Sequence, residues 1–148
     1  MSNGDVLPFD ITPIVRDSCL CLHVQRAARA LARRFDEALR SVDLTNGQFS
    51  LMMSLNRPEA PTMGSVSALL ALDRTTLTAK LKPLERRGLV TVRVDGADKR
   101  NRRLALTDAG RALLAEALPL WKAAHAATER LVAGSGTDRL RADLRALS

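Results

Sequence analysis

The sequence predicts a mainly α-helical fold with one small β-hairpin, and three observations support this fold class. Hydrophobic residues make up 46% of the 148 positions, but aromatic residues make up only 3% and tyrosine is absent. Leucine and alanine, which favour helices, must therefore provide most of the packing. Several segments carry apolar residues at helical spacing, and one run, LVTVRV, has the alternating β-branched pattern of a strand.

The N-terminal part is predicted to form one long amphipathic helix. Thr12 is expected to cap this helix, with Pro13 at its first position, because proline needs no hydrogen-bond partner there. Apolar residues recur every seven positions from Ile14 to Phe35, with arginines on the other sides. The helix is expected to end near Ser41.

Two short helices are predicted next. Thr45 and Gln48 have the spacing of a capping box, which predicts a helix running to about Asn56. Residues 57–61 contain two prolines and are predicted to form a loop. Thr62 is expected to cap the following helix. Its inward-facing residues are expected to be Val66, Leu69 and Leu70.

A fourth helix is predicted from Asp73, as its N-cap, to Arg87, with Gly88 after its end. Pro83 removes one backbone hydrogen bond and should kink the helix. The side chains expected to face the core are those of Leu77, Leu81 and Leu84. Helical geometry then directs Thr75, Thr76, Ala79, Lys82 and Arg86 outward, with Thr78 and Lys80 flanking them.

The segment after the fourth helix is predicted to be a hairpin. Its strands are residues 89–94 and 103–106, and its polar turn starts at Asp95-Gly96. With the third and fourth helices, the hairpin gives a winged helix-turn-helix. Thr107 is expected to cap a long helix to Ala133, interrupted by Pro119. A last short helix should start at Thr137 or Asp138 and carry Leu140, Leu144 and Leu147.

This order of elements predicts three regions. Residues 1–44 form an N-terminal segment with a dimerisation helix, residues 45–106 form the winged helix-turn-helix, and residues 107–148 form C-terminal dimerisation helices. The outer helices have more apolar surface than a middle of about sixty residues can cover. We therefore expect a symmetric homodimer.

Positive charge is concentrated in residues 74–103, which hold ten Lys or Arg residues against three acidic ones, while the flanks nearly balance. A local excess of this size can displace counterions from a nucleic acid backbone. The fourth helix suits the major groove, and the basic hairpin tip suits the minor groove, with Asp98 as an orienting ion-pair partner. The predicted DNA-binding residues are Arg74, Thr75, Thr76, Thr78, Lys80, Lys82, Arg86, Lys99, Arg100 and Arg102.

Four short runs resemble the MarR family of bacterial transcription regulators: DRTTLT from Asp73, LKPLERRGLV from Leu81, DKR from Asp98 and LTDAG from Leu106. The resemblance spans roughly residues 15–133. It implies a winged-helix dimer that binds pseudo-palindromic operators in double-stranded DNA, usually as a repressor. It also implies that residues 74–86 enter the major groove and that Arg100 enters the minor groove. Many members have a longer polar or basic residue where this chain has Ala79.

The resemblance further implies release from DNA by a small ligand, often an aromatic or anionic one, or by cysteine oxidation. The residues considered for an effector pocket are His23, Phe49, Met52, Met53 and Trp121. Cys19 and Cys21 are candidates for a redox switch, and Cys19 lies on the same helical face as His23. The redox branch of the family stabilises its thiolate with tyrosine hydroxyls, which this chain lacks. Packing roles are therefore favoured for both cysteines.

Other functional classes find little support in the sequence. The nucleophile-elbow, P-loop and zinc-protease motifs are absent and there are only two histidines, so we expect no enzyme and no cofactor. Cys19, His23 and His125 are too few for a closed zinc site. An RNA-binding winged helix is the remaining alternative. No signal peptide, membrane span or disulfide framework is predicted, so we expect a cytoplasmic protein.

Overall fold

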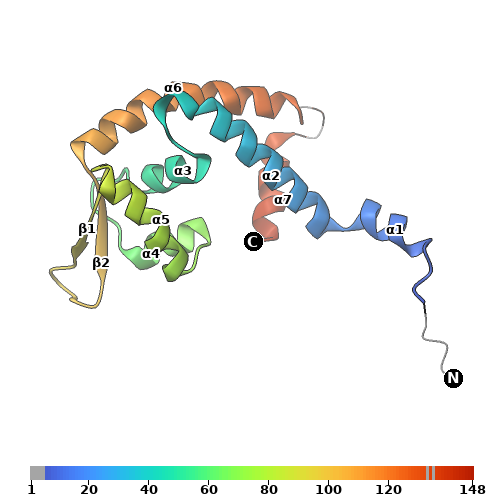
Figure 1. Cartoon of the computed structure of the whole chain (residues 1–148), viewed down its shortest axis with the longest axis horizontal. Helices are drawn as coiled ribbons and strands as arrows, with labels where there is room; N and C mark the ends of the chain where they lie inside the picture. Colours follow the sequence, from blue (N-terminus) through green and yellow to red (C-terminus); the bar gives the residue numbers. More distant parts are fainter. Residues whose placement is uncertain (1–5, 133, 135) are drawn as a thin grey trace. The chain divides into compact units, whose positions relative to one another are not determined.

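The computed structural model describes residues 6–132, 134 and 136–148. The chain divides into two compact units, and the division falls between Arg34 and Phe35, inside helix α2. Figure 1 gives the element order along the chain. The predicted fold class, mainly helical with a two-stranded antiparallel wing, is confirmed.

The first unit contains α1 (Ile11–Ser18) and most of α2 (Leu20–Ala38), so the single long helix predicted there is wrong. The chain leaves helical geometry at Cys19, which has an extended backbone (φ −68°, ψ 109°). Two side chains favour this break, because Ser18 Oγ donates to the Ile14 carbonyl and Cys19 Sγ accepts from the backbone N–H of Leu22. Thr12 is not the cap, since α1 already begins at Ile11 after Asp10.

The second unit begins with the end of α2 and a 3-10 turn, η1 (Arg40–Val42), followed by α3 (Asn46–Ser54). The capping box at the start of α3 is confirmed in full. Thr45 Oγ1 accepts from Gln48 N at 3.1 Å, and the Gln48 side chain accepts from Thr45 N at 3.0 Å. Asp36 adds a further acceptor, because its Oδ1 receives both the backbone and the side-chain N–H of Asn46 at 2.7 Å.

The helix-turn-helix consists of α4 (Met63–Leu70) and α5 (Arg74–Arg86). Thr62 caps α4 as predicted, and Ala71 turns the chain with a left-handed backbone (φ 52°). Val66 is fully buried and Leu70 packs against the core, but Leu69 is 59% exposed, so its predicted inward position is wrong. It lies one position beyond Ala68, which is also exposed, on the outer side of a helix of only two turns.

The wing is formed by β1 (Val90–Val94) and β2 (Arg102–Leu106), paired antiparallel with Val90 opposite Leu106. It is followed by α6 (Asp108–Arg130) and α7 (Thr137–Ala146). Both helices that contain an internal proline continue past it. Helix α6 continues through Pro119, so the predicted interruption is wrong, and α5 continues through Pro83 to Arg86. The predicted end of the long helix at Ala133 falls outside the described residues.

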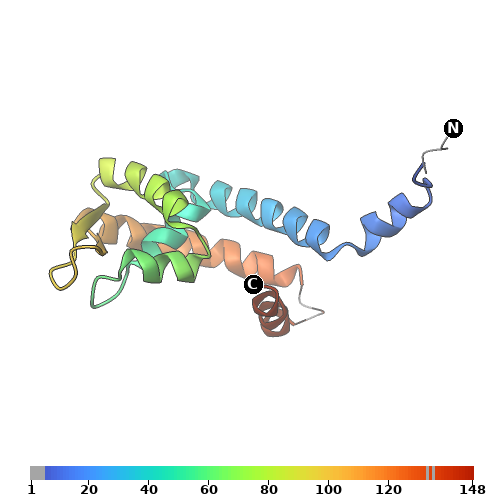
Figure 2. The same ribbon diagram turned by 90° about the horizontal axis from the view of Figure 1, so that it is seen from below.

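One hydrophobic core holds the second unit together. Its members are contributed by η1 and its flanks, α3, α4, α5, both strands and the first half of α6, which lie together in the two views of Figures 1 and 2. The largest fully buried side chains are Leu39, Leu51, Met52, Leu77, Leu81, Leu84, Leu104 and Val66. This core fixes α5 and the wing relative to each other, because both contribute side chains to it.

Candidate nucleic-acid interface

Helix α5 is held at its N-terminus by Asp73. One carboxylate oxygen accepts from Thr76 N at 2.7 Å and the other from Thr76 Oγ1 at 2.8 Å. These hydrogen bonds stabilise the charged carboxylate and lower the pKa of Asp73 below its ordinary value. The cap therefore fixes the start of α5 and uses the hydroxyl of Thr76 to do so.

The two faces of α5 differ as the sequence predicts. Leu77, Leu81 and Leu84 are 0–1% exposed, which fixes the rotation of the helix against the core. The predicted outer residues are exposed, except Thr76, which is half-buried at the cap. The exposed residues are Arg74, Thr75, Thr78, Ala79, Lys80, Lys82 and Arg86. Thr78 Oγ1 donates to the Arg74 carbonyl at 2.8 Å, so this hydroxyl is satisfied inside the helix.

The tip of the wing, residues 95–101, is an ordered turn. Asp95 N donates to the Asn101 carbonyl at 3.0 Å, and Asn101 N donates to the Asp98 carbonyl at 2.9 Å. Asp98 Oδ1 accepts from Arg100 N at 3.0 Å and from Arg100 Nε at 3.3 Å. The Arg100 side chain is 91% exposed. The predicted role of Asp98 as an orienting partner is confirmed, and Arg100 extends into solvent from a fixed turn.

Arg102 and Arg103 are adjacent in the sequence but contact different parts of the structure. Arg102 Nη1 reaches the carbonyls of Lys99 and Asn101 at the tip of the wing. Arg103 instead donates to the Ala60 carbonyl at 2.9 Å and pairs with Asp95, whose side chain is only 12% exposed. The sequence did not reveal this role for Arg103, because it depends on a loop 43 positions away.

The same loop pairs with the wing through its backbone. Leu104 N donates to the Pro61 carbonyl at 3.0 Å, and Thr62 forms an isolated antiparallel bridge with Arg103. Residues 57–61 therefore form a loop, as predicted, and the next residue, Thr62, pairs with β2 at a single bridge position. The half-buried Arg103 side chain lies over this junction and attaches the wing to the start of α4.

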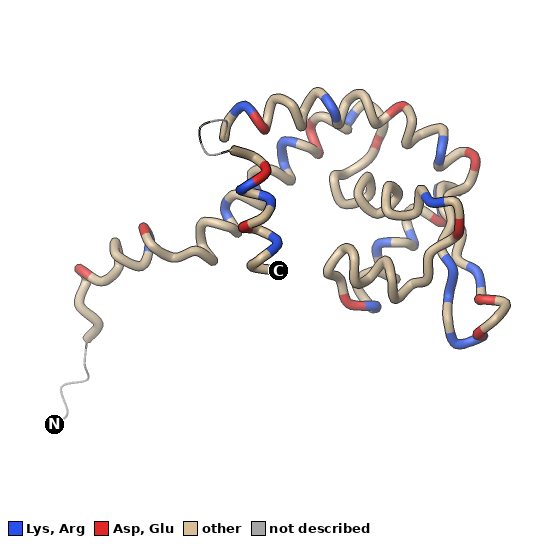
Figure 3. Tube along the Cα trace, turned by 180° about the vertical axis from the view of Figure 1, so that it is seen from behind, with Lys and Arg blue, Asp and Glu red and all other residues tan. Residues whose placement is uncertain are grey.

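Arg87 is a second basic residue with a structural role. Its Nη1 donates to the Asp43 carbonyl at 2.7 Å, and its Nη2 lies 3.8 Å from the Asp43 carboxylate. Asp43 follows η1 with a left-handed backbone. Arg87 thus connects the end of α5 to the turn before α3. Figure 3 shows the other basic positions of this region along α5 and around the wing.

The residues considered for an effector pocket fall into two groups. Phe49 stacks on Trp121 with ring centroids 5.9 Å apart, Met52 is fully buried, and Met53 packs partly buried against the same core. Trp121 also stacks on His125 at 4.6 Å and lies 6.4 Å from Phe35. His23 belongs to the first unit and is exposed. Phe35 was not among the residues predicted for the pocket, although it lies beside Trp121.

The candidate redox residues Cys19 and Cys21 and the neighbouring His23 make separate hydrogen bonds. His23 Nδ1 lies 2.7 Å from the carbonyl oxygen of Cys19, while the Cys19 thiol faces the N–H of Leu22. Cys21 is exposed and accepts from Gln25 Nε2 at 3.2 Å. Among the described residues, no three His, Cys, Asp or Glu side chains gather where they could hold a metal ion.

Comparisons with known proteins agree with this geometry. The sequence model of the MarR family matches residues 44–101 of this chain. Over nearly its whole length the chain also resembles the solved DNA complex of the Mycobacterium tuberculosis transcriptional regulator MosR. The two are 39% identical with a TM-score of 0.77, covering 88% of this chain and 93% of MosR. The chain belongs to the MarR family.

Three further relatives match this chain at lower identity or coverage. The repressor CouR, solved on a 23-mer DNA duplex, is 31% identical with a TM-score of 0.73, covering 90% of this chain and 92% of CouR. TtmR of Methylorubrum extorquens is 37% identical over 97 residues, which are 66% of this chain but only half of TtmR. The organic hydroperoxide resistance regulator of Bacillus subtilis is 31% identical, covering 66% of this chain and 65% of that protein.

Family membership settles the broad class of activity. The protein is a DNA-binding transcription regulator of the MarR type with a winged helix-turn-helix, and MarR regulators are not enzymes. The prediction that the chain is no enzyme is therefore confirmed. Among the described residues, no helix is both long and apolar enough to cross a membrane.

Proposed function

We propose that this MarR-type regulator is a homodimeric repressor that binds a pseudo-palindromic operator through α5 and the wing. The DNA contact is proposed because α5 and the wing both expose basic side chains and both pack on the same core. Helix α5 exposes Thr75, Lys82 and Arg86 while its leucines are buried, and Asp98 holds Arg100 away from the protein. Helix α5 would read the major groove, and Arg100 would lie in the adjacent minor groove.

The DNA-contact set is Arg74, Thr75, Thr76, Thr78, Lys80, Lys82, Arg86, Lys99, Arg100 and Arg102. Local hydrogen bonds divide this set by function. Thr76 and Thr78 already use their hydroxyl protons within α5, so their hydroxyl oxygens can act only as acceptors without rearrangement. Thr75 and the lysines carry the base and phosphate contacts in this proposal. Ala79 would offer only a methyl group, which suits a thymine.

The homodimer proposal rests on apolar surface that the described chain leaves exposed. No described residue of α1, α2 or α7 is buried. The large apolar side chains exposed on these helices or just after α7 include Ile14, Val15, Leu20, Val24, Leu31, Leu140, Leu144 and Leu147. Covering such side chains contributes about 1.5–3 kcal/mol each when burial is complete. A second copy of the same chain is the simplest way to cover helices from both ends of the sequence.

Repression is proposed by similarity to CouR, which is named a transcriptional repressor and is 31% identical to this chain. Release by a small aromatic or anionic ligand is proposed because Phe49, Trp121 and His125 form a stacked aromatic group on α3 and α6. A flat ligand can insert beside such rings, and Met53 offers an adaptable neighbour. The protein would act in the cytoplasm, where the operator is.

DNase I footprinting on the promoter of the chain's own gene tests this proposal. Two protected half-sites about 10 base pairs apart, centre to centre, are expected for a dimer with two α5 helices in successive major grooves. One short protected half-site with a single bound chain would contradict the dimeric arrangement. RNA competing as well as duplex DNA would contradict major-groove reading, because the A-form major groove is too narrow for α5.

A redox-controlled regulator of the same fold is the second candidate. The Cys19 thiol caps α2 at the break after α1, the Cys21 thiol is exposed, and the Bacillus relative is named for organic hydroperoxide resistance. In this scheme a thiolate attacks the peroxide, giving a sulfenic acid and the corresponding alcohol. Mass spectrometry and DNA binding after cumene hydroperoxide treatment test it. If oxidation leaves DNA binding of the wild type and of Cys19→Ser unchanged, this candidate is wrong.

A further inference from the structure

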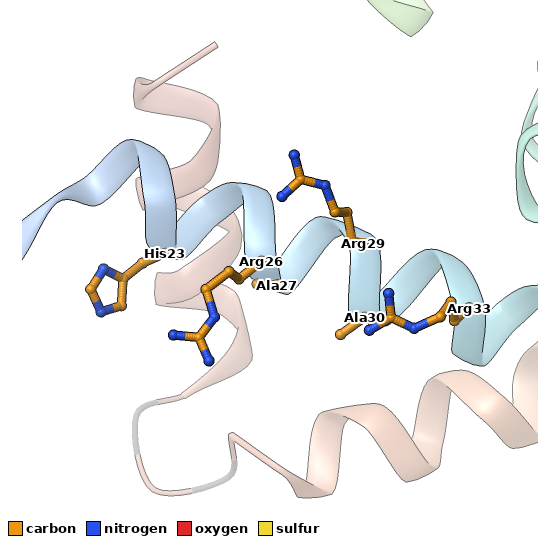
Figure 4. A pocket seen from close by; sticks show the side chains of 6 residues that line it. All are labelled: His23, Arg26, Ala27, Arg29, Ala30 and Arg33. Atoms are coloured by element: carbon orange, nitrogen blue, oxygen red, sulfur yellow. The ribbon is translucent and has the colours of Figure 1, made fainter. Parts of the chain in front are cut away.

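The N-terminal unit carries a cluster of arginines that the DNA-binding proposal does not use. Arg26, Arg29 and Arg33 stand on α2 around Ala27 and Ala30. Figure 4 shows these side chains extending from the helix around the two alanines, with His23 one turn before Arg26. Together they line a hollow of about 520 Å³. This arginine hollow lies entirely within the first unit, and none of its residues belongs to α5 or the wing.

The arginines of the hollow lack a counter-charge in their own unit. Residues 6–34 contain two acidic residues, Asp10 and Asp17, and the only ion pair within this described unit joins Asp17 to Arg16. Just after α2, Arg40 at the start of η1 has Glu37 three positions earlier as its partner. Like charges three and four positions apart on a helix, as in Arg26–Arg29 and Arg29–Arg33, repel one another. A cluster with this repulsion is stabilised when an anion binds.

The shape of the hollow limits the anions that fit. Arg26 and Arg33 are seven residues apart, which places their Cα atoms about 10 Å apart along the helix axis. Ala30 stands between them, so its small side chain leaves room for a ligand against the helix. All six lining residues are exposed, so the hollow is open to solvent and a ligand would enter it without displacing other parts of the unit. A single carboxylate would reach one guanidinium, whereas a ligand with two phosphate groups can engage both ends.

Guanidinium chemistry favours phosphate in this position. The planar N–H fork of arginine matches two oxygens of a phosphate group, and the resulting charge-assisted hydrogen bonds are short and strong. His23 does not compete for this role at Nδ1, because that atom faces the Cys19 carbonyl at 2.7 Å. The backbone of a DNA duplex would rest on the outer guanidiniums and would not enter a hollow floored by two methyl groups.

We propose that the arginine hollow of α2 is a binding site for a small molecule that carries at least two phosphate groups. Arg26 and Arg33 bind its two ends and Arg29 adds a third cation. Ala27 and Ala30 provide the space for the ligand. The site does not depend on the operator or on the repressor role proposed above.

Isothermal titration of the full-length protein with inorganic pyrophosphate at low salt tests this proposal. The double variant Arg26→Ala/Arg33→Ala should bind pyrophosphate at least tenfold more weakly than the wild type. Arg34→Ala is the matched control, because Arg34 is an exposed arginine on the same helix that does not line the hollow. It should change the affinity less than twofold. Alanine favours helix, so α2 should fold in all variants, and circular dichroism checks this.

Three results would overturn the proposal. Absence of pyrophosphate binding to the wild type, or an equal loss in Arg34→Ala, would show that the hollow has no specific affinity for phosphate. Dissociation of the oligomer in the double variant, without any pyrophosphate effect, would mean that the arginines contact a second copy. A shallower salt dependence of DNA binding in the double variant, again without pyrophosphate binding, would assign the arginines to DNA.

Discussion

Gly110 on α6 packs directly against the backbone of Leu89, the residue that leads into β1. A Cβ atom at position 110 would overlap the Leu89 carbonyl oxygen and lie 3.0 Å from its carbonyl carbon. The same junction is closed by Thr107, whose N–H donates to Leu89 O at 3.0 Å and whose Oγ1 donates to Gly88 O at 2.6 Å. The first turn of α6 and the start of the wing therefore form one tightly packed corner.

Gly110→Ala should destabilise the protein, because the added methyl group must displace backbone at this corner. The expected loss in the free energy of unfolding is about 1–3 kcal/mol, the usual range for overpacking. Gly64→Ala is the control, since a Cβ there meets nothing within 4 Å and alanine favours the helix by up to about 1 kcal/mol. Urea denaturation measures both variants. Equal stability of Gly110→Ala and wild type would show that the corner can relax.

Arg103→Ala should loosen the attachment of the wing to the loop before α4. Its hydrogen bond to Ala60 O and its ion pair with the mostly buried Asp95 are lost together, which should lower the free energy of unfolding by about 1–2 kcal/mol. Arg102→Ala serves as the comparison, because its contacts are longer and confined to the tip. Hydrogen exchange at Leu104, whose N–H donates to Pro61 O, should accelerate only in Arg103→Ala.

The elements that the sequence predicted well are those with a local signal. Thr45, Thr62, Asp73 and Thr107 each precede an apolar-periodic run, and each side chain accepts a hydrogen bond from the backbone three residues later. The inner face of α5 was also predictable from a local signal, because the spacing of its leucines decides which side of the helix packs against the core. The exposed basic face of α5 follows directly from that rotation.

The features that the sequence did not reveal depend on distant partners or on competing local bonds. No proline or glycine marks the break at Cys19, and the apolar periodicity continues across it. The break is instead accompanied by the side-chain hydrogen bonds of Ser18 and Cys19, which the sequence pattern does not show. In the sequence Arg103 is not distinguishable from the other basic residues of the wing, because its hydrogen-bond partner, the Ala60 carbonyl, is 43 positions away. The stacking of Trp121 on Phe49 likewise joins α3 to α6. Apolar periodicity within each helix does not show which helices pack together.

Acid should loosen the start of α5 through Asp73. The pKa of this carboxyl is lowered in the folded protein because Thr76 donates to both of its oxygens, so protons bind more tightly to the unfolded chain. The stabilisation is therefore complete above the unfolded pKa, near 3.9, and is lost as the pH falls through the lower folded value. Asp73→Asn should show a weaker loss of stability over this range. Matching pH profiles would contradict the assignment.

The dimer proposal predicts that a charge on α7 will separate the subunits. Leu144→Asp puts a carboxylate on a helix that has no buried residue in the single chain, so the monomer fold should tolerate it. In the dimer the same carboxylate would be buried without a partner, at a cost of several kcal/mol. Sedimentation velocity at micromolar concentration should show dimers for the wild type and monomers for the variant. A folded wild-type monomer would contradict the proposal.

The wing and α5 should make different kinds of DNA contact, and salt dependence separates them. Arg100 extends from a turn fixed by Asp98, so Arg100→Ala should weaken binding to operator and unrelated DNA by similar factors. It should also make the slope of affinity against salt shallower by about one unit, as for one lost phosphate contact.

Thr75 is uncharged and exposed on the outer face of α5, so Thr75→Ala should leave the salt slope nearly unchanged. It should weaken operator binding by about 1 kcal/mol while sparing unrelated DNA. Fluorescence anisotropy at several salt concentrations measures both variants. Thr78→Ala changes another member of the DNA-contact set and should weaken operator binding less than Thr75→Ala, because the Thr78 hydroxyl already donates to the Arg74 carbonyl. If Arg100→Ala changed neither affinity nor slope, the wing would be a solvated turn and its position on DNA would be wrong.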